Sequence, residues 1–337
     1  MTIKDIARLS GCAVGTVSRV LNGHPDVSDA TREKVMAVVK EYGFRPNSNA
    51  KHLKQQASYG IAIIVKGTRN MLFASLVELL QAHIKDRGYT AFPYYIEEEE
   101  NEVEQAIQIC RERRPYGILF LGSNLEFFRT AFHQVTVPCV MVTNSGATLG
   151  FENLASVATD DETAAASAVR YLLEQGHRKI GVLGGRMEAS LASCARMQGV
   201  RRAMEEYSLD FDMDSQYSFA RFSVQSGYRA MECLLKKMPD VTAVFAMGDV
   251  MAIGAIRALH DHGKRVPQDI SIVGFDGIEM ASYCTPKLTT IQQQDAVLAR
   301  RGVELLLDQV EKGREAAHEW VEFHLSVGES VMRAVTE

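Results

Sequence analysis

The sequence predicts two kinds of architecture in one chain: an N-terminal all-α headpiece with a helix-turn-helix pattern, and a larger α/β region of two lobes, each built on a doubly wound parallel sheet. Three short amphipathic segments separated by turn residues predict the headpiece within residues 1–46. From Tyr59 onward, apolar runs of strand length alternate with amphipathic runs of helix length, and the alternation starts again near residue 161. Such alternation is typical of βαβ units in parallel sheets.

The headpiece is expected to contain three helices around one small core. The first runs from Thr2, its cap, to about residue 9, and Gly11 breaks it. The second spans residues 14–21 and turns two valines and a leucine inward. Its small or polar outer face consists of Gly15, Thr16, Ser18, Arg19 and Asn22. The third begins after Ser28, its expected side-chain cap, and ends before Gly43.

A helix-turn-helix places its second helix in the major groove of DNA, where small and hydrogen-bonding side chains reach base edges. The charge distribution agrees with this interpretation. Residues 1–57 carry nine Lys/Arg against five Asp/Glu (+4), which leaves 28 against 37 (−9) for the rest of a chain with a net charge of −5. An ordinary helical pair without a ligand has the same helix–gap–helix pattern, so the pattern alone leaves both interpretations open.

Residues 47–58 form a polar linker between the headpiece and the α/β region. Leu53 is its one large apolar side chain, so the linker cannot build a core. Pro46 suits the start of a helix. A short, marginal helix over about 47–55 is therefore plausible, although the composition favours a flexible segment.

The α/β region, residues 59–337, follows a regular order of elements. The first lobe is predicted to hold strands at 60–65, 89–96, 117–121 and 137–143 and helices at 71–87, 101–114 and 124–133. The second is predicted to hold helices at 161–175, 195–207, 225–237 and 250–262 and strands at 180–184, 241–247 and 270–275. A last helix at 295–312 precedes strands near 320–325 and 330–333. We assign 59–160 and 291–318 to the first lobe, and 161–290 and 319–337 to the second.

Open parallel sheets bind ligands at the carboxyl ends of their strands, so two facing lobes predict a ligand cleft. Nothing in the sequence predicts catalysis there. The glycine cluster at 181–185 lacks the dinucleotide fingerprint, no Walker lysine follows a glycine loop, and no G-x-S-x-G elbow occurs. His260 and His262 would diverge by about 200° on a helix, and the acidic run 97–100 is expected to open a helix as a charged surface. We expect no catalytic residue, no metal and no cofactor.

Composition and termini bear on the compartment. The 337 residues are 46% hydrophobic and 23% charged, as in a globular protein with two or three domains. The six cysteines show neither metal-ligand spacing nor a disulfide pattern. The N-terminus has no signal-peptide core, and no window approaches the ~18 apolar residues of a membrane span. We therefore expect a cytoplasmic protein with no membrane partner.

Several segments resemble the LacI/GalR family of bacterial transcriptional regulators, and the resemblance covers nearly the whole chain. In the headpiece these are residues 2–7, 16–23, 27–28 with 31–32, and 43–47; later they are 176–181, Asp249 within 247–254, 273–276 and 288–291. The resemblance implies a repressor or, less often, an activator that binds a pseudo-palindromic operator in double-stranded DNA as a homodimer, and is nucleoid-associated when bound. It also implies a periplasmic-binding-protein-like effector domain that binds a sugar or related metabolite between its lobes.

The resemblance assigns DNA-binding roles residue by residue. The corresponding positions are Thr2, Val14, Gly15, Thr16, Ser18, Arg19, Asn22, Ser28, Asn47, Ala50, Lys51 and Leu53. Val14, Gly15 and Arg19 match base-reading positions, and Arg19 suits a bidentate guanine contact. Leu53 matches a hinge-helix leucine that enters the minor groove as an apolar wedge. The chain departs from the family pattern at Ala13, where a capping serine is customary, and at Gly15, which offers no side chain for readout.

In the predicted cleft, the resemblance assigns the effector site. It carries over Phe73, Asp160, Arg196, Phe222 and Asp276, whereas Thr143 and Gly248 stand where sugar-binding members often have aspartate and asparagine. Carboxylates and a guanidinium can hold hydroxyls, and aromatic faces can cover a sugar or a base. Each residue also has an ordinary structural alternative: a salt bridge for Arg196, a turn cap for Asp276, core packing for the phenylalanines. The two departures leave a modified or less hydroxylated ligand open.

Effector binding is expected to alter lobe closure and so to order or melt the hinge helices. A dimer is expected because no leucine-heptad tail follows the final strand. Two alternatives remain. A solute-binding protein of periplasmic type has the same cleft but would need a signal peptide and no basic headpiece. A small-molecule enzyme would need a nucleophile–base pair.

Overall fold

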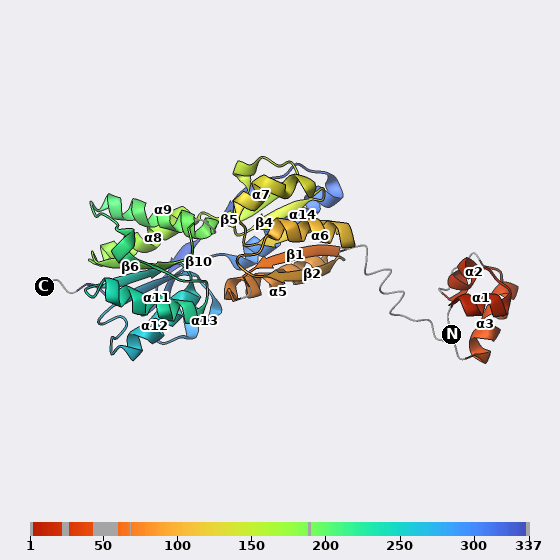
Figure 1. The fold of residues 1–337 in the computed structure, drawn as a ribbon, viewed down its shortest axis with the longest axis horizontal. Helices are drawn as coiled ribbons and strands as arrows, with labels where there is room; N and C mark the ends of the chain where they lie inside the picture. The colour runs from red at the N-terminus through yellow and green to blue at the C-terminus, as the bar shows by residue number, and fades with distance from the viewer. Residues whose placement is uncertain (1–2, 22–26, 43–59, 68, 188–189, 335–337) are drawn as a thin grey trace. The chain divides into compact units, whose positions relative to one another are not determined.

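The computed structural model describes residues 3–21, 27–42, 60–67, 69–187 and 190–334. The chain divides into two compact units, residues 1–58 and 59–337. Figure 1 draws the first in red and the second from orange to blue. No described helix combines the length and the apolar character that a bilayer crossing requires.

The described part of the first unit contains α1 (Ile3–Ser10), α2 (Val14–Leu21) and α3 (Asp29–Glu41). These helices share a core of buried side chains: Ile6, Ala7, Val17, Val20 and Val35. The helical spacing of these apolar residues explains why α2 has the bounds predicted from the sequence. The predicted start and stop signals, Thr2 and Gly43, lie outside the described residues.

Ser28 is the N-cap residue of α3, as predicted, and has extended backbone (φ −61°, ψ 147°). Its side chain, however, accepts no capping hydrogen bond from the described helix. Its hydroxyl instead lies 2.9 Å from the hydroxyl of Thr31. The backbone carbonyl of Ser28 starts the helix by accepting from the N–H groups of Thr31 and Arg32.

The first lobe of the second unit is a sheet of six described strands in the order β11-β5-β4-β3-β1-β2, paired in parallel throughout. The strands are β1 (Gly60–Lys66), β2 (Thr90–Ile96), β3 (Gly117–Leu121), β4 (Cys139–Val142), β5 (Leu154–Thr159) and β11 (His318–Val321). Helices α5 (Met71–Asp86) and α14 (Asp295–Lys312) cover one face, and α6 (Glu102–Arg113) and α7 (Leu125–Ala131) cover the other (Figure 1). The short turns η1 (Phe132–Gln134) and η2 (Ala147–Leu149) follow α7 and β4.

Alternate residues of β1 serve opposite faces of this sheet. Ile61 and Ile63 belong to the core under α5 and α14, whereas Ala62 and Ile64 belong to the core under α6 and α7. Every residue of β1 is buried. A central parallel strand covered on both faces therefore reads as a continuous apolar run, which is why the sequence predicts it.

Asparagine caps start the helices that follow β1, β2 and β3. The side chains of Asn70, Asn101 and Asn124 each accept a hydrogen bond, at 3.0 Å, from the backbone N–H two residues further on. The predicted ranges 101–114 and 124–133 counted the cap residues as part of the helices. The observed helices therefore begin one residue later than predicted.

The second lobe is a sheet of six described strands in the order β12-β10-β9-β8-β6-β7, parallel except for the pair β10–β12. Its strands are β6 (Ile180–Gly184), β7 (Tyr217–Phe219), β8 (Ala243–Ala246), β9 (Ser271–Asp276), β10 (Thr289–Gln292) and β12 (His324–Ser326). One face packs on α8 (Asp161–Glu174) and α9 (Leu191–Glu206), the other on α11 (Val224–Lys237) and α12 (Asp249–Asp261). The short helices are α10 (Met213–Gln216) and α13 (Glu279–Tyr283).

Several element predictions are corrected. The sequence did not predict β5, β7 or β10, because β7 has three residues and the other two mix small or hydroxylated side chains with apolar ones. The strand expected near 330–333 is absent from this described segment. There the Ser330 hydroxyl donates to the carbonyl of Ile272 at 2.6 Å and accepts from the N–H of Thr289 at 2.8 Å. These bonds attach the segment to β9 and β10 without a ladder.

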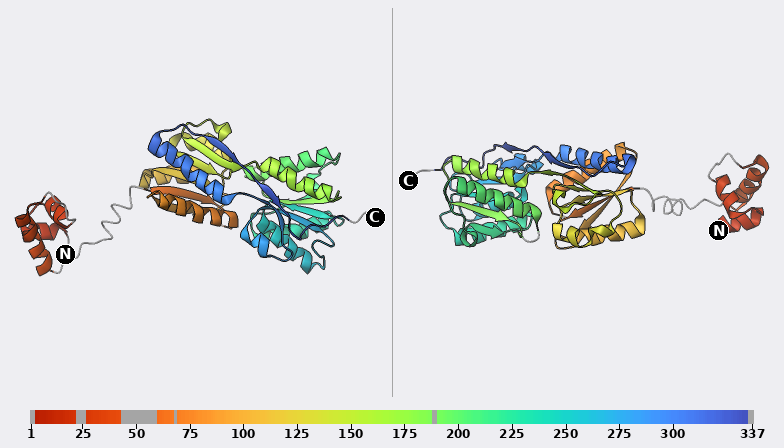
Figure 2. Two further views of the ribbon diagram at one scale, coloured as in Figure 1. Left: turned by 180° about the vertical axis from the view of Figure 1, so that it is seen from behind. Right: turned by 90° about the horizontal axis from the view of Figure 1, so that it is seen from above.

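Within the described residues, the chain passes between the lobes at three places: residue 160, residues 293–294 and residues 322–323. The predicted lobe boundaries at 290/291 and 318/319 are therefore corrected, because β10 pairs in the second sheet and β11 in the first. The single strand predicted near 320–325 is two strands, one in each lobe. Figure 2 shows the late part of the chain, in blue, contributing to both lobes.

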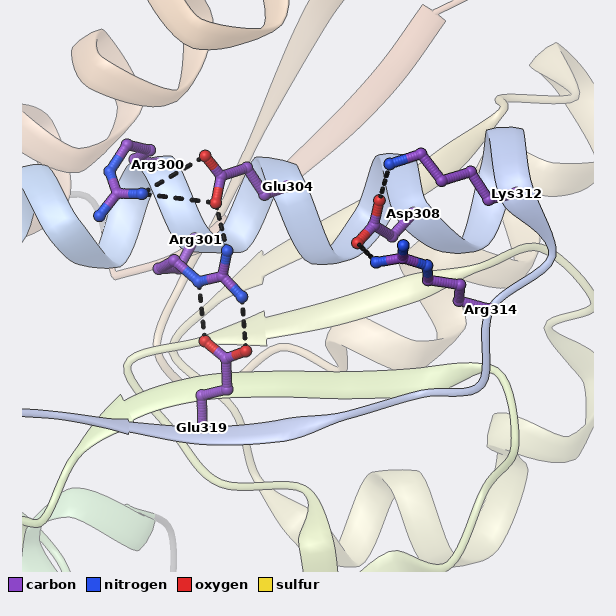
Figure 3. Close-up of polar contacts among 7 residues, drawn as sticks. All are labelled: Arg300, Arg301, Glu304, Asp308, Lys312, Arg314 and Glu319. Carbon is purple, nitrogen blue, oxygen red and sulfur yellow. Dashed lines mark hydrogen bonds and ion pairs between the residues drawn. The ribbon is translucent and has the colours of Figure 1, made fainter.

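Arg301 attaches α14 to β11 in the first lobe, as Figure 3 shows. Its Nε donates to Glu319 Oε2 at 2.8 Å, and its Nη2 donates to Glu319 Oε1 at 2.6 Å. This is the bidentate geometry in which a guanidinium binds a carboxylate most strongly. Arg301 also pairs with Glu304 of the same helix. The pair thus fixes the edge strand to the helix that precedes it.

Candidate functional site

The outer face of α2 consists of exposed and partly exposed residues. Val14, Gly15 and Arg19 are exposed, and Thr16 and Ser18 are partly exposed. A Cβ atom added at Gly15 would meet no atom within 4 Å. Because Val17 and Val20 anchor the opposite face in the core, the described part of this helix presents its small and polar side to solvent.

A cavity of about 150 Å³ lies between the two lobes of the second unit. Its walls come from the carboxyl ends of strands in both sheets, as expected for parallel α/β sheets. From the first lobe they include Lys66, Asn70, Phe73, Glu98, Glu99, Gly122, Ser123, Thr143 and Asn144. From the second lobe they include Arg186, Ser190, Arg196, Phe219, Arg221, Phe222, Asp276 and Gln293.

Arg196 is a buried cation of this cavity, contributed by the second lobe. Its Nε donates to Asp161 Oδ1 at 2.8 Å, its Nη1 donates to the carbonyl of Met247 at 2.5 Å, and its Nη2 lies 3.6 Å from Asp276 Oδ1. The guanidinium also lies 3.6 Å from the ring centroid of Phe275. These contacts hold the guanidinium in one orientation.

Asp276 ends β9 at the cavity wall. Its Oδ1 accepts a hydrogen bond from Gln293 Nε2 at 2.8 Å, whereas its Oδ2 is buried and has no hydrogen-bond partner in the described part of the chain. Burial raises the pKa of Asp276 to about 6, although Arg196 acts in the opposite direction. A buried carboxylate oxygen without a partner favours a ligand that donates a hydrogen bond to it.

Asp249 holds the backbone that carries Asp276. Its Oδ2 accepts from the N–H groups of Gly277 and Ile278 at 2.7 and 2.9 Å. Its Oδ1 accepts from the Thr290 hydroxyl at 2.5 Å. The backbone of Asp276 has a positive φ of 116°, a conformation that costs free energy unless the surroundings enforce it. Asp249 therefore acts as a positioning residue behind the cavity.

Phe73 and Phe222 line the cavity from opposite lobes. A Cβ atom at Gly122 would lie 3.1 Å from the ring of Phe73, and one at Gly248 would lie 3.0 Å from the ring of Phe222. The glycines therefore let the rings pack closely against the backbone. Phe73 and Phe222 together give the cavity apolar walls beside its charged groups.

Two family models match the chain. Residues 2–47 match the bacterial regulatory proteins of the lacI family, and residues 169–331 match the periplasmic binding protein-like domain. The transcriptional regulator MalR of Clostridium butyricum is 38% identical over 326 residues, which cover 94% of this chain and 95% of MalR. The chain belongs to the LacI family of bacterial transcriptional regulators.

Other relatives of this LacI-family chain agree. The transcriptional repressor CytR of Escherichia coli strain K12 is 34% identical over 312 residues, which cover 92% of this chain and 90% of CytR. The solved complex of the transcriptional regulator CelR with cellobiose is 29% identical, with a TM-score of 0.72, and covers 98% of this chain and 99% of CelR. The predicted family and fold are confirmed. The chain is a DNA-binding transcriptional regulator, and its relatives are regulators rather than enzymes.

The structure brings together most of the effector-site residues predicted for this LacI-family regulator. Phe73, Thr143, Arg196, Phe222 and Asp276 line the cavity. Asp160 does not: its Oδ1 caps α8 by accepting the N–H of Thr163 at 3.0 Å, and its neighbour Asp161 is the carboxylate that pairs with Arg196. Gly248 is not among the lining residues either, although a Cβ atom there would lie 3.0 Å from the ring of Phe222 and 3.6 Å from Asp276 Oδ2. The effector roles of Asp160 and Gly248 stay predictions.

Sequence reasoning missed several cavity residues of the first lobe, namely Lys66, Glu98, Glu99 and Ser123. The acidic run 97–100 does not open a helix, because α6 begins after the Asn101 cap. Glu99 instead forms an ion pair with Arg221 of the second lobe. The sequence offered one indication of their role: each of these residues closely follows the end of a predicted strand, where ligands of parallel sheets bind.

The DNA-binding assignments divide into two groups. Val14, Gly15, Thr16, Ser18 and Arg19 belong to the outward part of α2 described above, and Ser28 precedes α3. The others, Thr2, Asn22, Asn47, Ala50, Lys51 and Leu53, lie outside the described residues.

Proposed function

We propose that the chain is a homodimeric repressor whose affinity for a pseudo-palindromic operator is controlled by a sugar or related metabolite bound between the lobes. The observation that carries this proposal is Asp276 Oδ2, which is buried without a hydrogen-bond partner among the described residues, in a cavity that also holds an oriented guanidinium and the rings of Phe73 and Phe222. Sugars donate and accept hydrogen bonds through hydroxyls and cover aromatic faces with their C–H groups. The cellobiose complex of CelR supports a sugar as the ligand class.

DNA reading is assigned to the outer face of α2. Arg19 is the best candidate for a bidentate guanine contact, worth about 1–3 kcal/mol of discrimination. The charge of +4 on residues 1–57 favours attraction to phosphates. A symmetric operator requires two copies of this helix, and hence a dimer. Such a regulator acts in the cytoplasm, on the nucleoid.

Control by the effector is assigned to the linker, residues 47–58. A change in lobe closure alters the spacing of the two linkers in the dimer and so favours or disfavours their helical form, with Leu53 as the wedge in the minor groove. The coupling between effector and operator is typically ~1–3 kcal/mol and is reciprocal for binding. Operator DNA must therefore change effector affinity by the same factor.

The test is a selection of bound duplexes from random sequence by the full chain, alone and with cellobiose, maltose, D-glucose, D-ribose and a set of nucleosides. We expect a two-fold symmetric motif whose enrichment changes with one of these ligands. Calorimetry then measures the affinity of that ligand with and without the selected duplex. Equal affinities would contradict the coupling, and failure to enrich any motif would contradict specific DNA reading. Removal of residues 1–57 should abolish duplex binding and leave ligand binding intact.

A further inference from the structure

Ser123, on the first-lobe wall of the cavity, has a hydroxyl group that finds no hydrogen-bond partner among the described residues. The residue follows β3, is 8% exposed, and its Oγ is buried with no hydrogen-bond partner in the described ranges. Buried hydroxyls in native proteins are normally hydrogen-bonded, so an unpaired one at a cavity wall calls for an explanation. A ligand in the cavity would supply the missing partner.

The loop that carries Ser123 is anchored on both sides. Gly122 has a φ of +76°, and a Cβ atom there would lie 3.1 Å from the ring of Phe73. On the other side, the backbone N–H of Asn124 donates to Glu102 Oε1 at 2.5 Å, and the Asn124 side chain caps α7. The Ser123 hydroxyl is therefore held at a fixed place on the wall.

Glu102 connects this loop to Lys66, which also lines the cavity. Lys66 Nζ donates to Glu102 Oε2 at 2.6 Å, and the two side chains are 7% and 0% exposed. The ammonium lies 4.7 Å from the ring centroid of Phe127. An ammonium has three N–H donors, of which Glu102 accepts one. Because Glu102 compensates the charge, Lys66 offers the cavity a hydrogen-bond donor with little net charge.

The two walls are therefore complementary in hydrogen bonding. The second lobe contributes an acceptor, Asp276 Oδ2, and the first lobe contributes two residues with donor groups, Ser123 and Lys66, to the cavity wall. A ligand that satisfies both must donate on one side and accept on the other. Uncharged sugars have this property, because hydroxyls do both and ring oxygens accept.

We propose that Ser123 and Lys66 form a second recognition point for the effector, opposite Asp276, and that they select an uncharged sugar with an oxygen acceptor at that position. This inference rests on the proposed function and deepens it. A ligand held by Ser123 of one lobe and Asp276 of the other interacts with both only when the lobes are close. It therefore favours the closed arrangement.

The experiment is calorimetric titration of the full chain with cellobiose, maltose, D-glucose and D-ribose, in parallel for wild type, Ser123→Ala and Thr159→Val. Thr159 is the matched control, because its hydroxyl is also buried and unpartnered within the described residues but does not line the cavity. For the sugar that binds wild type, we expect Ser123→Ala to weaken affinity by about 2- to 12-fold, as for the loss of one neutral hydrogen bond. Thr159→Val should leave affinity unchanged.

Thermal melting separates recognition from folding. Ser123→Ala removes an unpaired buried hydroxyl, so its Tm without ligand should equal or exceed that of wild type. A residue that merely supported the fold would lower the Tm and the affinity together. For Lys66, the double variant Lys66→Met with Glu102→Gln avoids an unpaired buried carboxylate and keeps an acceptor for the Asn124 N–H. It too should weaken sugar binding.

Single-deoxy analogues of the bound sugar locate the contact. The analogue that lacks the oxygen facing Ser123 should bind wild type and Ser123→Ala equally, whereas the others should keep the difference. Equal binding of the parent sugar by both proteins would overturn this inference and leave the proposed function standing. Failure of every sugar to bind wild type would overturn the proposed sugar effector, and this inference with it.

Discussion

Arg221 of the second lobe forms an ion pair with Glu99 of the first lobe at the edge of the cavity. Both residues line the cavity, and their side chains are 53% and 61% exposed. The neighbouring Glu98 interacts with the backbone N–H of Phe222, also across the lobes, and burial raises its pKa. The acidic run after β2 therefore makes contacts that exist only when the lobes lie close together.

Arg221→Glu should weaken binding of the proposed sugar effector about 2- to 5-fold at low ionic strength, because an exposed pair contributes at most ~1 kcal/mol to closure. The exchanged double variant Glu99→Arg with Arg221→Glu should restore the affinity. Since salt screens exposed charges, the difference should disappear in molar salt. Calorimetric titrations at two salt concentrations check this, and an exchanged variant no better than the single variant would contradict it.

Asp276→Asn should abolish most of the effector binding without destabilising the fold. Burial raises the pKa of Asp276 to about 6, so the ionised form is unfavourable in the folded state and its cost is fully present above about pH 6. The neutral variant should therefore be more stable than wild type by about 1–3 kcal/mol at pH 7.5. The difference should shrink as the pH falls from 6 towards 4. Urea unfolding at these pH values measures it; a difference that grew towards acid would contradict the assignment.

His177 should make the second lobe acid-sensitive. Its Nε2 lies 3.0 Å from the carbonyl of Met332, its Nδ1 lies 3.1 Å from the Thr242 hydroxyl, and burial lowers the pKa of His177 below its usual 6.5. The folded state favours the neutral ring. The free energy of unfolding is therefore at its full value above pH 6.5, and it decreases below pH 6.5 because the unfolded chain takes up a proton more readily than the folded chain. Thermal melts of His177→Gln should show a shallower loss between pH 6.5 and 5. The control His260→Gln, at a residue whose side chain is 77% exposed, should melt like wild type at each pH.

Arg301→Lys should lower the free energy of unfolding by about 1 kcal/mol, because lysine cannot form the bidentate pair with Glu319 seen in Figure 3. Both side chains are 32% exposed, and solvent reduces the contribution accordingly. Lys312→Ala, on the same helix, is the control. Asp308 then keeps Arg314 as a partner, and the change should stay below about 0.5 kcal/mol. Denaturant titration measures the free energy of unfolding of both variants. A loss for Arg301→Lys, which keeps the positive charge, would show that the bidentate geometry of the pair contributes to stability.

Leu53→Ala should weaken specific operator binding at least ~10-fold and leave nonspecific binding nearly unchanged, since an apolar wedge acts only where the duplex is kinked. Arg19→Ala should also lose specificity, but at a defined base pair of the operator. Titration of the selected duplex and of a scrambled duplex at matched salt measures both effects. Equal losses on the two duplexes would remove the wedge role from Leu53.

The fold was largely predictable because its signals are local. Apolar runs covered on both faces and helical spacing of apolar residues mark most of the strands and helices. The exceptions are strands whose stability comes from their neighbours. β7 has three residues and pairs at a sheet edge, and β10 reads as Thr-Thr-Ile-Gln although its first three residues are buried. Tertiary packing, which composition does not reveal, makes these segments strands.

The cavity residues Phe73, Arg196 and Phe222 were predictable from the family resemblance, whereas several residues that follow strand ends in the first lobe were missed. Two adjacent aspartates follow β5, and the sequence cannot tell which one caps α8 and which one pairs with Arg196. Lys66 and Glu102 are 36 positions apart, and charged residues are expected in solvent unless a partner compensates them. Their burial as a pair depends on the order of the strands, which no local pattern encodes.

The third passage of the chain between the lobes bears on biosynthesis. Residues 318–321 form the last strand of one sheet and residues 324–326 form the last strand of the other. Neither sheet can therefore be complete while the ribosome is still translating the preceding residues. The two halves of the receptor must therefore finish folding almost together. A nascent chain that stalls before this point leaves two unprotected strand edges, which are the usual starting points of aggregation.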